Sequence, residues 1–271
     1  MGADESAGRR RLRTSFNTQA ELYDRARPTY PDVLFDDMVT LAALKPLSRL
    51  LEVGCGTGQA TIPLARRGYA ITCLELGREL AQLAARNLST FPNVSVINTS
   101  LEDWRPRTKD VFDLVFAATA WHWIDPEVRY AKAHACLRTN GYLAVWSAAH
   151  VFPAGGDPFF REIQDVYDEI GEGKDVDTLW PTPDQLEDSG REIEATGLFT
   201  DVAVRRYDWE VEYDADSYID LLSTFSGHIA MEGWKRGRLN SEIRRRLAQR
   251  PSASLHRHWG VVLNVARKQA E

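Results

Sequence analysis

Short apolar runs, separated by longer mixed segments, recur through the first half of the chain. They fall at residues 50–53, 70–74, 94–98, 114–118 and 142–146. Most of the intervals are long enough for a helix, and strands that alternate with helices form a parallel sheet covered on both faces. The pattern therefore predicts a doubly wound α/β fold.

Helical patterns precede this region, over residues 17–26, which must end before Pro28, and over residues 31–44. Asn140-Gly141 comes just before the fifth predicted strand and is typical of a helix C-cap.

Beyond residue 147 the pattern changes. A Pro- and Gly-rich run at 153–158, an acidic stretch at 168–175 and Trp180-Pro181-Thr182-Pro183 predict an insertion or lid. The remaining segments predict a strand, two helices and a last strand, at residues 202–211, 216–225, 241–249 and 256–266.

The first predicted strand leads directly into three alternate glycines, Gly54, Gly56 and Gly58. Glycine is needed where a loop turns tightly and brings backbone N–H groups against a ligand. A dinucleotide fingerprint requires G-x-G-x-x-G, but here the third glycine comes one residue early, and no Lys-Ser or Lys-Thr follows as in a P-loop. The spacing indicates a nucleotide site and argues against nicotinamide, flavin and P-loop ligands.

An acidic residue followed by G-x-G-x-G, here Glu52 with the three glycines, resembles the first motif of class I S-adenosylmethionine-dependent methyltransferases. Glu75 ends the second predicted strand, at the separation that one strand-helix-strand unit requires for a carboxylate that holds both ribose hydroxyls. The resemblance implies S-adenosyl-L-methionine as cofactor and a Rossmann-like, seven-stranded, mostly parallel sheet with the last two strands antiparallel.

The same resemblance implies further cofactor contacts. Ser100 and Leu101 fall on the positions that contact adenine edges, although many relatives carry Asp where this chain has Ser100, and Glu102 or Asp103 could substitute. Leu76 and Leu101 are expected to sandwich the adenine ring, or else are ordinary core leucines. Ala118 begins the loop at the methyl-transfer edge.

That loop contains Trp121, His122 and Trp123. Carboxyl ends of parallel strands open onto the ligand crevice, so the loop is expected beside the reacting sulfonium. His122 either accepts a proton from the acceptor or only shapes the pocket, because some nucleophiles need no base. The rings of Tyr23, Trp121 and Trp123 can favour a cation, or simply pack. The Asn/Asp-Pro-Pro-aromatic motif of base-amine methyltransferases is absent, which disfavours DNA.

A second resemblance lies upstream, where residues 23–31 carry Tyr-x-x-x-Arg-Pro-x-Tyr-Pro. This segment is similar to that of small-molecule methyltransferases related to trans-aconitate methyltransferase, which form carboxyl methyl esters, and in them it folds over the cofactor. Tyr23 and Arg27 match the motif. Arg27 is chemically suited to a bidentate pair with the methionyl carboxylate, the alternative being a surface arginine at a helix end.

Three segments are expected. They are a tail with cofactor-covering helices (1–45), a Rossmann-like core (46–150), and a lid or helical cap with the strands that complete the sheet (151–271). Acceptor contacts are expected in the last segment, from Tyr167, Trp180, Tyr218 and Phe225, together with Trp121 and Trp123. The acidic lid disfavours a highly anionic acceptor unless arginines such as Arg205, Arg206 or Arg236 compensate.

Composition narrows the function classes. With 33 basic and 39 acidic residues, the net charge of −6 lacks the electrostatic footprint of a nucleic-acid-binding protein, and the cluster at Arg9 to Arg13 is expected to belong to a tail. Three scattered cysteines indicate a reducing compartment and no metal site, and no run is long enough for a membrane span, so a cytoplasmic location is expected.

We therefore expect an enzyme that methylates a small organic metabolite by direct displacement, on a hydroxyl or carboxyl oxygen. The alternatives are a C- or N-methyltransferase acting on an aromatic molecule and a non-catalytic protein that binds the cofactor. The acceptor molecule, the atom methylated and the oligomeric state are not specified by the sequence.

Overall fold

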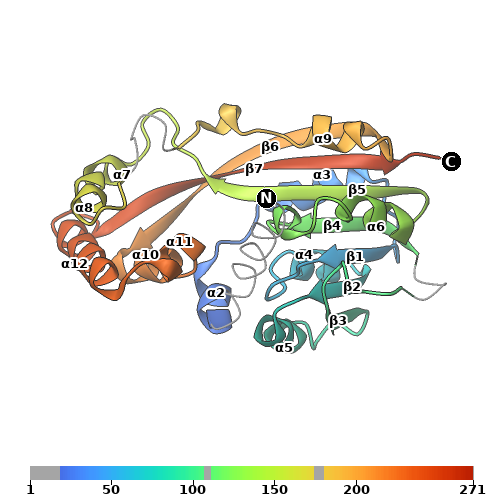
Figure 1. Ribbon diagram of the computed structural model, residues 1–271, viewed down its shortest axis with the longest axis horizontal. Helices are drawn as coiled ribbons and strands as arrows, with labels where there is room; N and C mark the ends of the chain where they lie inside the picture. The colour runs from blue at the N-terminus through green and yellow to red at the C-terminus, as the bar shows by residue number, and fades with distance from the viewer. Residues whose placement is uncertain (1–18, 107–110, 174–179, 271) are drawn as a thin grey trace.

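The computed structural model describes residues 19–106, 111–173 and 180–270. The basic cluster at Arg9 to Arg13, the start of the helix predicted at 17–26 and the end of the acidic stretch lie outside these residues. Figure 1 shows a central sheet with helices against it and a group of helices around the far end of its longest strands. We call that group the cap.

The sheet has seven strands in the order β3-β2-β1-β4-β5-β7-β6. Strands β1 to β5 are parallel, and β7 pairs antiparallel with both β5 and β6. The predicted doubly wound fold with two antiparallel strands at the end is confirmed. The strands are β1 (Arg49–Val53), β2 (Ala70–Glu75), β3 (Val94–Asn98), β4 (Phe112–Ala118), β5 (Leu137–His150), β6 (Phe199–Asp214) and β7 (Ser254–Lys268).

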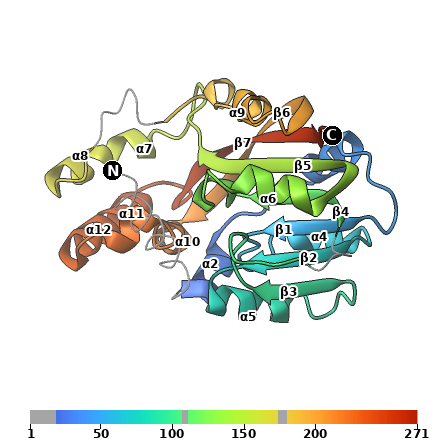
Figure 2. The same ribbon diagram turned by 45° about the vertical axis from the view of Figure 1, so that its right-hand side comes forward.

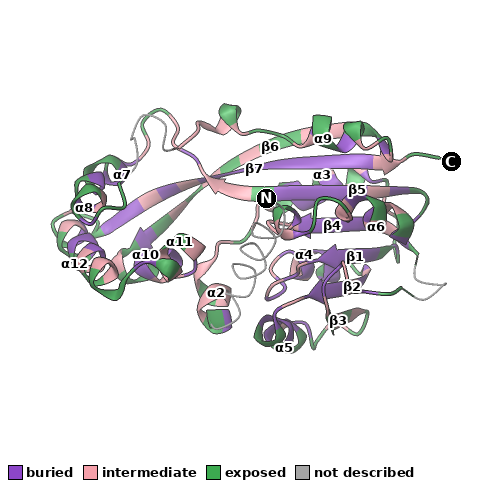
Figure 3. Cartoon of the chain, viewed as in Figure 1, coloured by how far each residue is buried: buried purple, intermediate pink, exposed green. Residues whose placement is uncertain are grey.

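The central strands are buried on both faces, which explains their continuous apolar runs. In β1, Leu50 packs into one core cluster and Leu51 into the other. Figure 3 shows these strands in purple, with the exposed surfaces on the helices around them. The core helices are α3 (Asp32–Leu41), α4 (Thr61–Arg66), α5 (Arg78–Asn87), α6 (Arg129–Cys136) and α9 (Gly190–Ala195).

Strands β5, β6 and β7 are longer than the sequence pattern predicted, and β6 and β7 continue from the core into the cap (Figures 1 and 2). There they pack against helices that come from two separate parts of the chain. The cap helices are α7 (Phe159–Glu162), α8 (Gln164–Glu169), α10 (Ala215–Leu222), α11 (Ser226–Ala230) and α12 (Gly233–Ala248). Helix α2 (Ala20–Ala26) contacts both α5 and α10, so it lies between core and cap.

The predicted helix C-cap at Asn140-Gly141 is wrong. Helix α6 ends earlier, at Cys136, and both residues lie inside β5, where the pairing of β4 with β5 shifts register. Asn140 has a φ of 60°. Asn tolerates this left-handed conformation, so the same two residues serve an irregular strand as well as a helix end.

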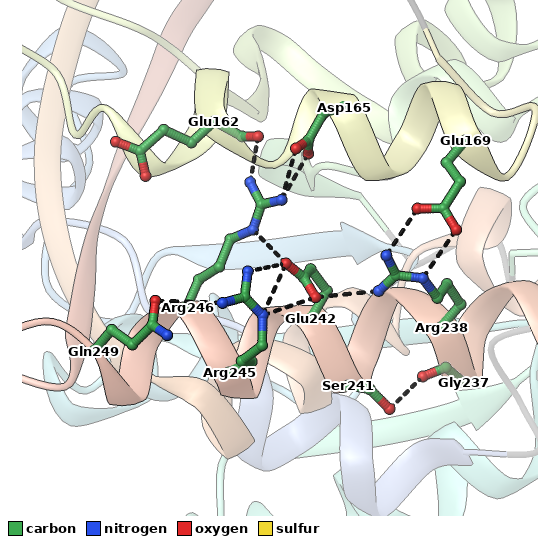
Figure 4. Close-up of polar contacts among 10 residues, drawn as sticks. All are labelled: Glu162, Asp165, Glu169, Gly237, Arg238, Ser241, Glu242, Arg245, Arg246 and Gln249. Atoms are coloured by element: carbon green, nitrogen blue, oxygen red, sulfur yellow. Dashed lines mark hydrogen bonds and ion pairs between the residues drawn. The ribbon is translucent and has the colours of Figure 1, made fainter.

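Ion pairs hold α12 against α8, and Arg246 also donates to the Glu162 carbonyl of α7 (Figure 4). Arg238 donates to Glu169 at 2.8 and 3.0 Å, and Arg246 donates to Asp165 at 2.7 and 2.9 Å. The side chain of Glu242 accepts hydrogen bonds from both arginines and from Arg245. Glu242 therefore orients the side chains that join the cap helices.

Candidate active site

Three cavities lie on the described part of the molecule near the carboxyl ends of the core strands, and two of them contain most of the predicted site residues. The first, which we call the core cavity, has a volume of about 310 Å³ and opens where β1 and β4 lie side by side. Strand order reverses at this point, which is where ligands bind in open α/β sheets. The residues predicted from sequence that line it are Tyr23, Arg27, Gly54, Gly56, Glu75, Leu76, Ser100, Leu101, Ala118, His122, Trp123 and Phe225.

The glycine loop after β1 forms one wall of the core cavity. Gly54 has a φ of +73°, and a Cβ at this position would lie 2.6 Å from the Cβ of Ala120. Gly56 has a φ of +57°, and a Cβ there would approach the ring of Tyr23 at 3.7 Å. Any side chain at Gly54 would push the loop away from β4, so this glycine sets the width of the cavity floor.

Glu75 ends β2 and faces the core cavity with its carboxylate held in place. One oxygen accepts a hydrogen bond from the Gly56 amide at 2.9 Å, and the other accepts one from the Gly77 amide at 2.8 Å. A carboxylate oxygen can accept more than one hydrogen bond. Glu75 is thus oriented by the backbone and retains capacity to accept from a ligand hydroxyl.

Two predicted cofactor residues are absent from the described lining and support the loop instead. Glu52 points toward α4, where Thr61 Oγ1 donates to it at 2.5 Å, and burial raises the pKa of Glu52 to about 7. A Cβ at Gly58 would lie 3.2 Å from Leu88. In this structure Glu52 contacts α4 and Gly58 lies against Leu88, and neither residue lines the core cavity.

The N-terminal segment is fastened over the glycine loop by two amide side chains. Gln59 Nε2 donates to the carbonyl groups of Asp24 and Arg27, at 3.2 and 3.1 Å. Asn87 Nδ2 donates both to Asp24 and to the Thr57 carbonyl. These contacts place Tyr23 and Arg27 in the cavity wall.

Arg27 joins this wall to the cap. Its Nε donates to Thr224 Oγ1 at 2.8 Å and its Nη2 to the Thr224 carbonyl at 2.9 Å. The guanidinium carbon lies 4.2 Å from the centroid of the Phe225 ring. Burial lowers the pKa of Arg27. Among the described residues no carboxylate pairs with it, so its charge remains available to an anion.

The loop after β3 supplies Ser100 and Leu101. The Ser100 hydroxyl donates to Asp103 at 2.9 Å and accepts from the Asp103 amide, which closes a turn. Leu101 is buried in the core cluster behind the cavity and also lines it. Neither Glu102 nor Asp103 is among the lining residues.

The loop after β4 is strained at its first residue. Thr119 has a φ of 53°, and its hydroxyl bonds with the Tyr30 hydroxyl at 2.8 Å. Such left-handed conformations of β-branched residues concentrate at functional sites. The loop continues into the short 3₁₀-helix η2 (Trp121–Trp123).

His122 lies at the rim of the core cavity. Partial burial, and secondarily the charge of Arg129, lower its pKa, so the imidazole is neutral at pH 7 and can accept a proton. Trp123 also lines the cavity, whereas the ring of Trp121 turns inward against Tyr130 at a centroid distance of 5.2 Å.

The second cavity, which we call the cap cavity, has a volume of about 320 Å³ and lies between α7, α8, α10, α11 and β7. Tyr167, Trp180 and Tyr218, three of the predicted acceptor residues, line it. Phe225 lines both cavities, so the two meet at this ring.

Sequence reasoning missed one charged residue of the cap cavity, Arg257. The arginines expected to compensate the acidic lid, Arg205, Arg206 and Arg236, line neither cavity. A signal was present: in β7, Leu255, Arg257 and Trp259 alternate with polar histidines, and alternate residues of a strand share a face. Arg257 is on the buried face.

Comparisons with known proteins agree with this geometry. Residues 51–145 match the family model described as a methyltransferase domain. Over 248 residues, 91% of each chain, the protein is 26% identical to an uncharacterized methyltransferase of Mycobacterium tuberculosis strain H37Rv. Over 110 residues, 40% of this chain and 41% of the other, it is 30% identical to trans-aconitate 2-methyltransferase of Deinococcus radiodurans.

Solved structures share the fold. A candidate type II methyltransferase from Anaeromyxobacter dehalogenans superposes with a TM-score of 0.59 and 24% identity, covering 89% of this chain and 97% of that one. Phosphoethanolamine N-methyltransferase 2 of Haemonchus contortus, solved with S-adenosylhomocysteine, has a TM-score of 0.53 and 13% identity, covering 94% of this chain and 58% of that one.

Two features are absent from the described residues. No helix among them is long and apolar enough to cross a membrane. Within the same residues no group of three or more His, Cys, Asp or Glu side chains could hold a metal ion.

Proposed function

We propose that this S-adenosylmethionine-dependent methyltransferase transfers a methyl group to an oxygen atom, hydroxyl or carboxyl, of a small organic molecule. The observation that carries the proposal is the meeting of two cavities at Phe225. The core cavity has the groups that a nucleoside needs, and the cap cavity has the aromatic walls typical of a small-molecule site.

The residues of the core cavity fit S-adenosylmethionine. Glu75 would hold the ribose hydroxyls, because its oxygens face the cavity in an orientation fixed by two backbone amides. The glycine loop lets the backbone approach the ligand where a side chain at Gly54 would collide. Leu76 and Leu101 would enclose the adenine, with Ser100 at its edge.

Arg27 and Tyr23 would hold the methionyl end. Arg27 lines the core cavity without a carboxylate partner among the described residues, and a bidentate pair with an α-carboxylate would satisfy its charge. Tyr23 lies over Gly56 and closes the cavity from the side of α2. That residues 1–45 form a separate segment whose helices cover the cofactor remains a proposal.

The bound cofactor supplies an electrophilic methyl group on a sulfonium. In the proposed transfer the acceptor oxygen would take this methyl group, and the sulfur would keep the electron pair of the methyl–sulfur bond. The chain contributes alignment, which needs no covalent nucleophile. With a hydroxyl acceptor, a ring nitrogen of the neutral His122 would take the proton; with a carboxylate acceptor, His122 would only shape the rim.

The test is transfer of label from methyl-labelled S-adenosylmethionine into a panel of small organic acids and phenols. Products are then treated with mild alkali, which releases methanol from esters and leaves ethers, amines and C-methyl groups intact. Label on oxygen supports the proposal. Label only on carbon or nitrogen, or cofactor binding without any transfer, contradicts it.

A further inference from the structure

The cap cavity contains one buried cation in an otherwise apolar setting. Arg257 projects from β7 and is only 6% exposed. Its guanidinium carbon lies 4.4 Å from the ring centroid of Trp259 and 5.2 Å from that of Phe225. Burying an arginine is costly unless an opposite charge accompanies it.

No carboxylate of the described residues pairs with Arg257, and its Nε atom is buried without a hydrogen-bond partner. Burial lowers the pKa of Arg257, as expected for a cation without a counter-charge. Glu172, the one carboxylate among the described residues of the lining, is partly exposed and pairs with Lys235 at 2.7 Å. Within the part of the chain that the structure describes, the charge of Arg257 is therefore left without a carboxylate partner.

The neighbouring residues of β7 show that this is specific to the inner face of the strand. His256 and His258, on the opposite face, both lie within hydrogen-bond distance of Glu210, at 2.8 and 2.9 Å. An acidic partner is thus provided for the polar face, where solvent also helps, whereas residues 19–106, 111–173 and 180–270 provide none for the buried arginine.

Neutral hydrogen-bonding groups line the cap cavity together with Arg257. Burial, followed by the charges of Arg257 and His258, lowers the pKa of His150 to about 2, so its ring is neutral, and its Nε2 is buried without a partner among the described residues. Tyr167 and Tyr218 line the same cavity. One cation with neutral donors and acceptors around it suits a single small anionic group.

We propose that the cap cavity binds an acceptor that carries a carboxylate, and that Arg257 receives this carboxylate while the aromatic walls enclose the apolar body of the molecule. The assignment rests on the proposed methyltransferase activity and names the chemical class of its acceptor. The carboxylate at Arg257 anchors the acceptor, and the reacting oxygen is a different atom that reaches the core cavity past Phe225.

The Phe225 ring separates two arginines with different tasks in this arrangement. Arg27 lies against the ring at 4.2 Å and lines the core cavity, and Arg257 lies 5.2 Å from the same ring and lines the cap cavity. Two carboxylates, one from the cofactor and one from the acceptor, would neutralise the pair. Loss of Arg257 should then affect the acceptor alone.

The experiment measures binding rather than turnover. Benzoate, phenylacetate and 3-phenylpropionate, each with its matching neutral amide, are titrated into the full chain saturated with S-adenosylhomocysteine. The change in tryptophan fluorescence reports binding, because Trp180 lines the cavity and Trp259 contacts Arg257.

The variants are Arg257→Met, which keeps a long apolar side chain, Arg257→Lys, which keeps the charge, and Arg161→Met as the matched control. Arg161 is an exposed cap arginine that also stacks on a ring, that of Phe152.

We expect at least one acid to bind wild type roughly tenfold or more tightly than its amide, as a charge-assisted hydrogen bond implies. Arg257→Met should lose this preference, Arg257→Lys should keep part of it because the charge remains without the planar fork, and Arg161→Met should keep all of it. Because a buried unpaired charge is removed, Arg257→Met should not lower the melting temperature.

The proposal is overturned if no acid binds, if the amides bind as tightly as the acids, or if Arg257→Met retains the preference. If Arg257→Met does not fold, an Arg257→Lys variant with unchanged preference and affinity overturns it equally. These acids have no oxygen besides the anchored carboxylate, so none of them is expected to be methylated. The proposed function fails separately, if the panel of organic acids and phenols gains no label on oxygen while the acids still bind at Arg257.

Discussion

The core cavity and the cap cavity are of similar volume but are built differently. Most of the core cavity is lined by segments at the ends of β1 to β4, with backbone groups and one carboxylate held by backbone amides, and side chains such as Tyr23, Arg27 and Phe225 close it from outside those segments. The cap cavity gathers side chains from distant parts of the chain, between residues 150 and 257. Substitutions change side chains and leave backbone groups in place. A site built from backbone groups therefore suits a ligand that does not vary, whereas a site built from side chains can be adapted to different acceptors by substitution.

The difference gives the two cavities different sensitivities. A change in the glycine loop should disturb the core cavity, and with it both cofactor binding and methyl transfer, because the backbone itself must move. Changes in the cap, other than at Thr224 and Phe225, which contact Arg27, should alter acceptor binding or the stability of the cap and leave cofactor binding intact.

The largest effect is expected from Gly54→Ala, which would break the core cavity. Its Cβ would meet the Cβ of Ala120 at 2.6 Å, and a left-handed φ adds strain. A displacement of about 1 Å at a reacting centre costs on the order of 100-fold in rate. We expect a loss of that size in methyl transfer, with weakened S-adenosylhomocysteine binding by calorimetry.

Gly68→Ala is the matched control for this change. Gly68 also has a left-handed φ, +84°, but a Cβ there would meet nothing within 4 Å. It should cost some stability and leave cofactor affinity unchanged. Equal losses of affinity in both variants would show that backbone strain, and not the close approach to Ala120, governs the cavity.

The sequence predicted the core cavity well because its determinants are local. Three alternate glycines after a strand, and a carboxylate at the end of the next strand, specify a loop and a ligand contact within one strand-helix-strand unit. Twelve predicted residues line the cavity, although Tyr23, Arg27 and Phe225 lie outside that unit and Phe225 was predicted as an acceptor contact. The orientation of Glu52 was missed, since spacing alone does not tell whether a motif residue faces the ligand or the helix behind it.

The cap cavity could be predicted only in outline. Aromatic residues of the last segment were expected near an acceptor, and Tyr167, Trp180 and Tyr218 do line one cavity. Arg257 was missed because the alternation in β7 indicates only that its side chain is buried, whereas its significance depends on the lack of a carboxylate partner among the described residues, which no local pattern reports. The lengths of β6 and β7 were underestimated for a related reason: their outer halves are exposed on one face and pack on cap helices on the other.

A smaller effect is expected from Glu52→Gln, which should change how the free energy of unfolding depends on pH. Burial raises the pKa of Glu52 to about 7, so the folded state holds its proton more tightly than the unfolded chain does. That stabilising contribution is complete below a pH of about 4.5 and is lost as the pH rises through about 7. In wild type the loss amounts to about 2–3 kcal/mol.

Denaturant titrations between pH 5 and pH 8 check this prediction. Glu52→Gln should remove most of the pH dependence in that window, whereas Glu127→Gln, an exposed control, should not. If the free energy of unfolding of Glu52→Gln depended on pH as steeply as that of wild type, the carboxyl group of Glu52 would already be solvated in the folded protein.

The smallest effect is expected from Glu242→Gln, which should lower the stability of the cap. Hydrogen bonds from Arg245 and Arg246 hold the pKa of Glu242 well below its usual range. The stabilisation is therefore present at neutral pH and is lost as the pH falls below about 4.5. We expect a cost of about 1–2 kcal/mol at neutral pH, since two of the three arginine partners are largely exposed and screened.

Thermal unfolding followed at pH 7 and pH 4 tests the Glu242 prediction, and cofactor affinity sharpens it. Glu242→Gln should lower the melting temperature at pH 7 and less so at pH 4, with S-adenosylhomocysteine affinity unchanged at pH 7. A matching loss of cofactor affinity would show that the cap network and the core cavity are not independent.

The division of tasks between the two cavities is tested most directly by calorimetric titration of S-adenosylhomocysteine into wild type, Glu75→Ala and Arg257→Met under one set of conditions. We predict that Glu75→Ala abolishes or severely weakens binding and that Arg257→Met binds as wild type does. Full retention of affinity in Glu75→Ala, or its loss in Arg257→Met, would contradict the assignment of the cofactor to the core cavity and the acceptor to the cap cavity.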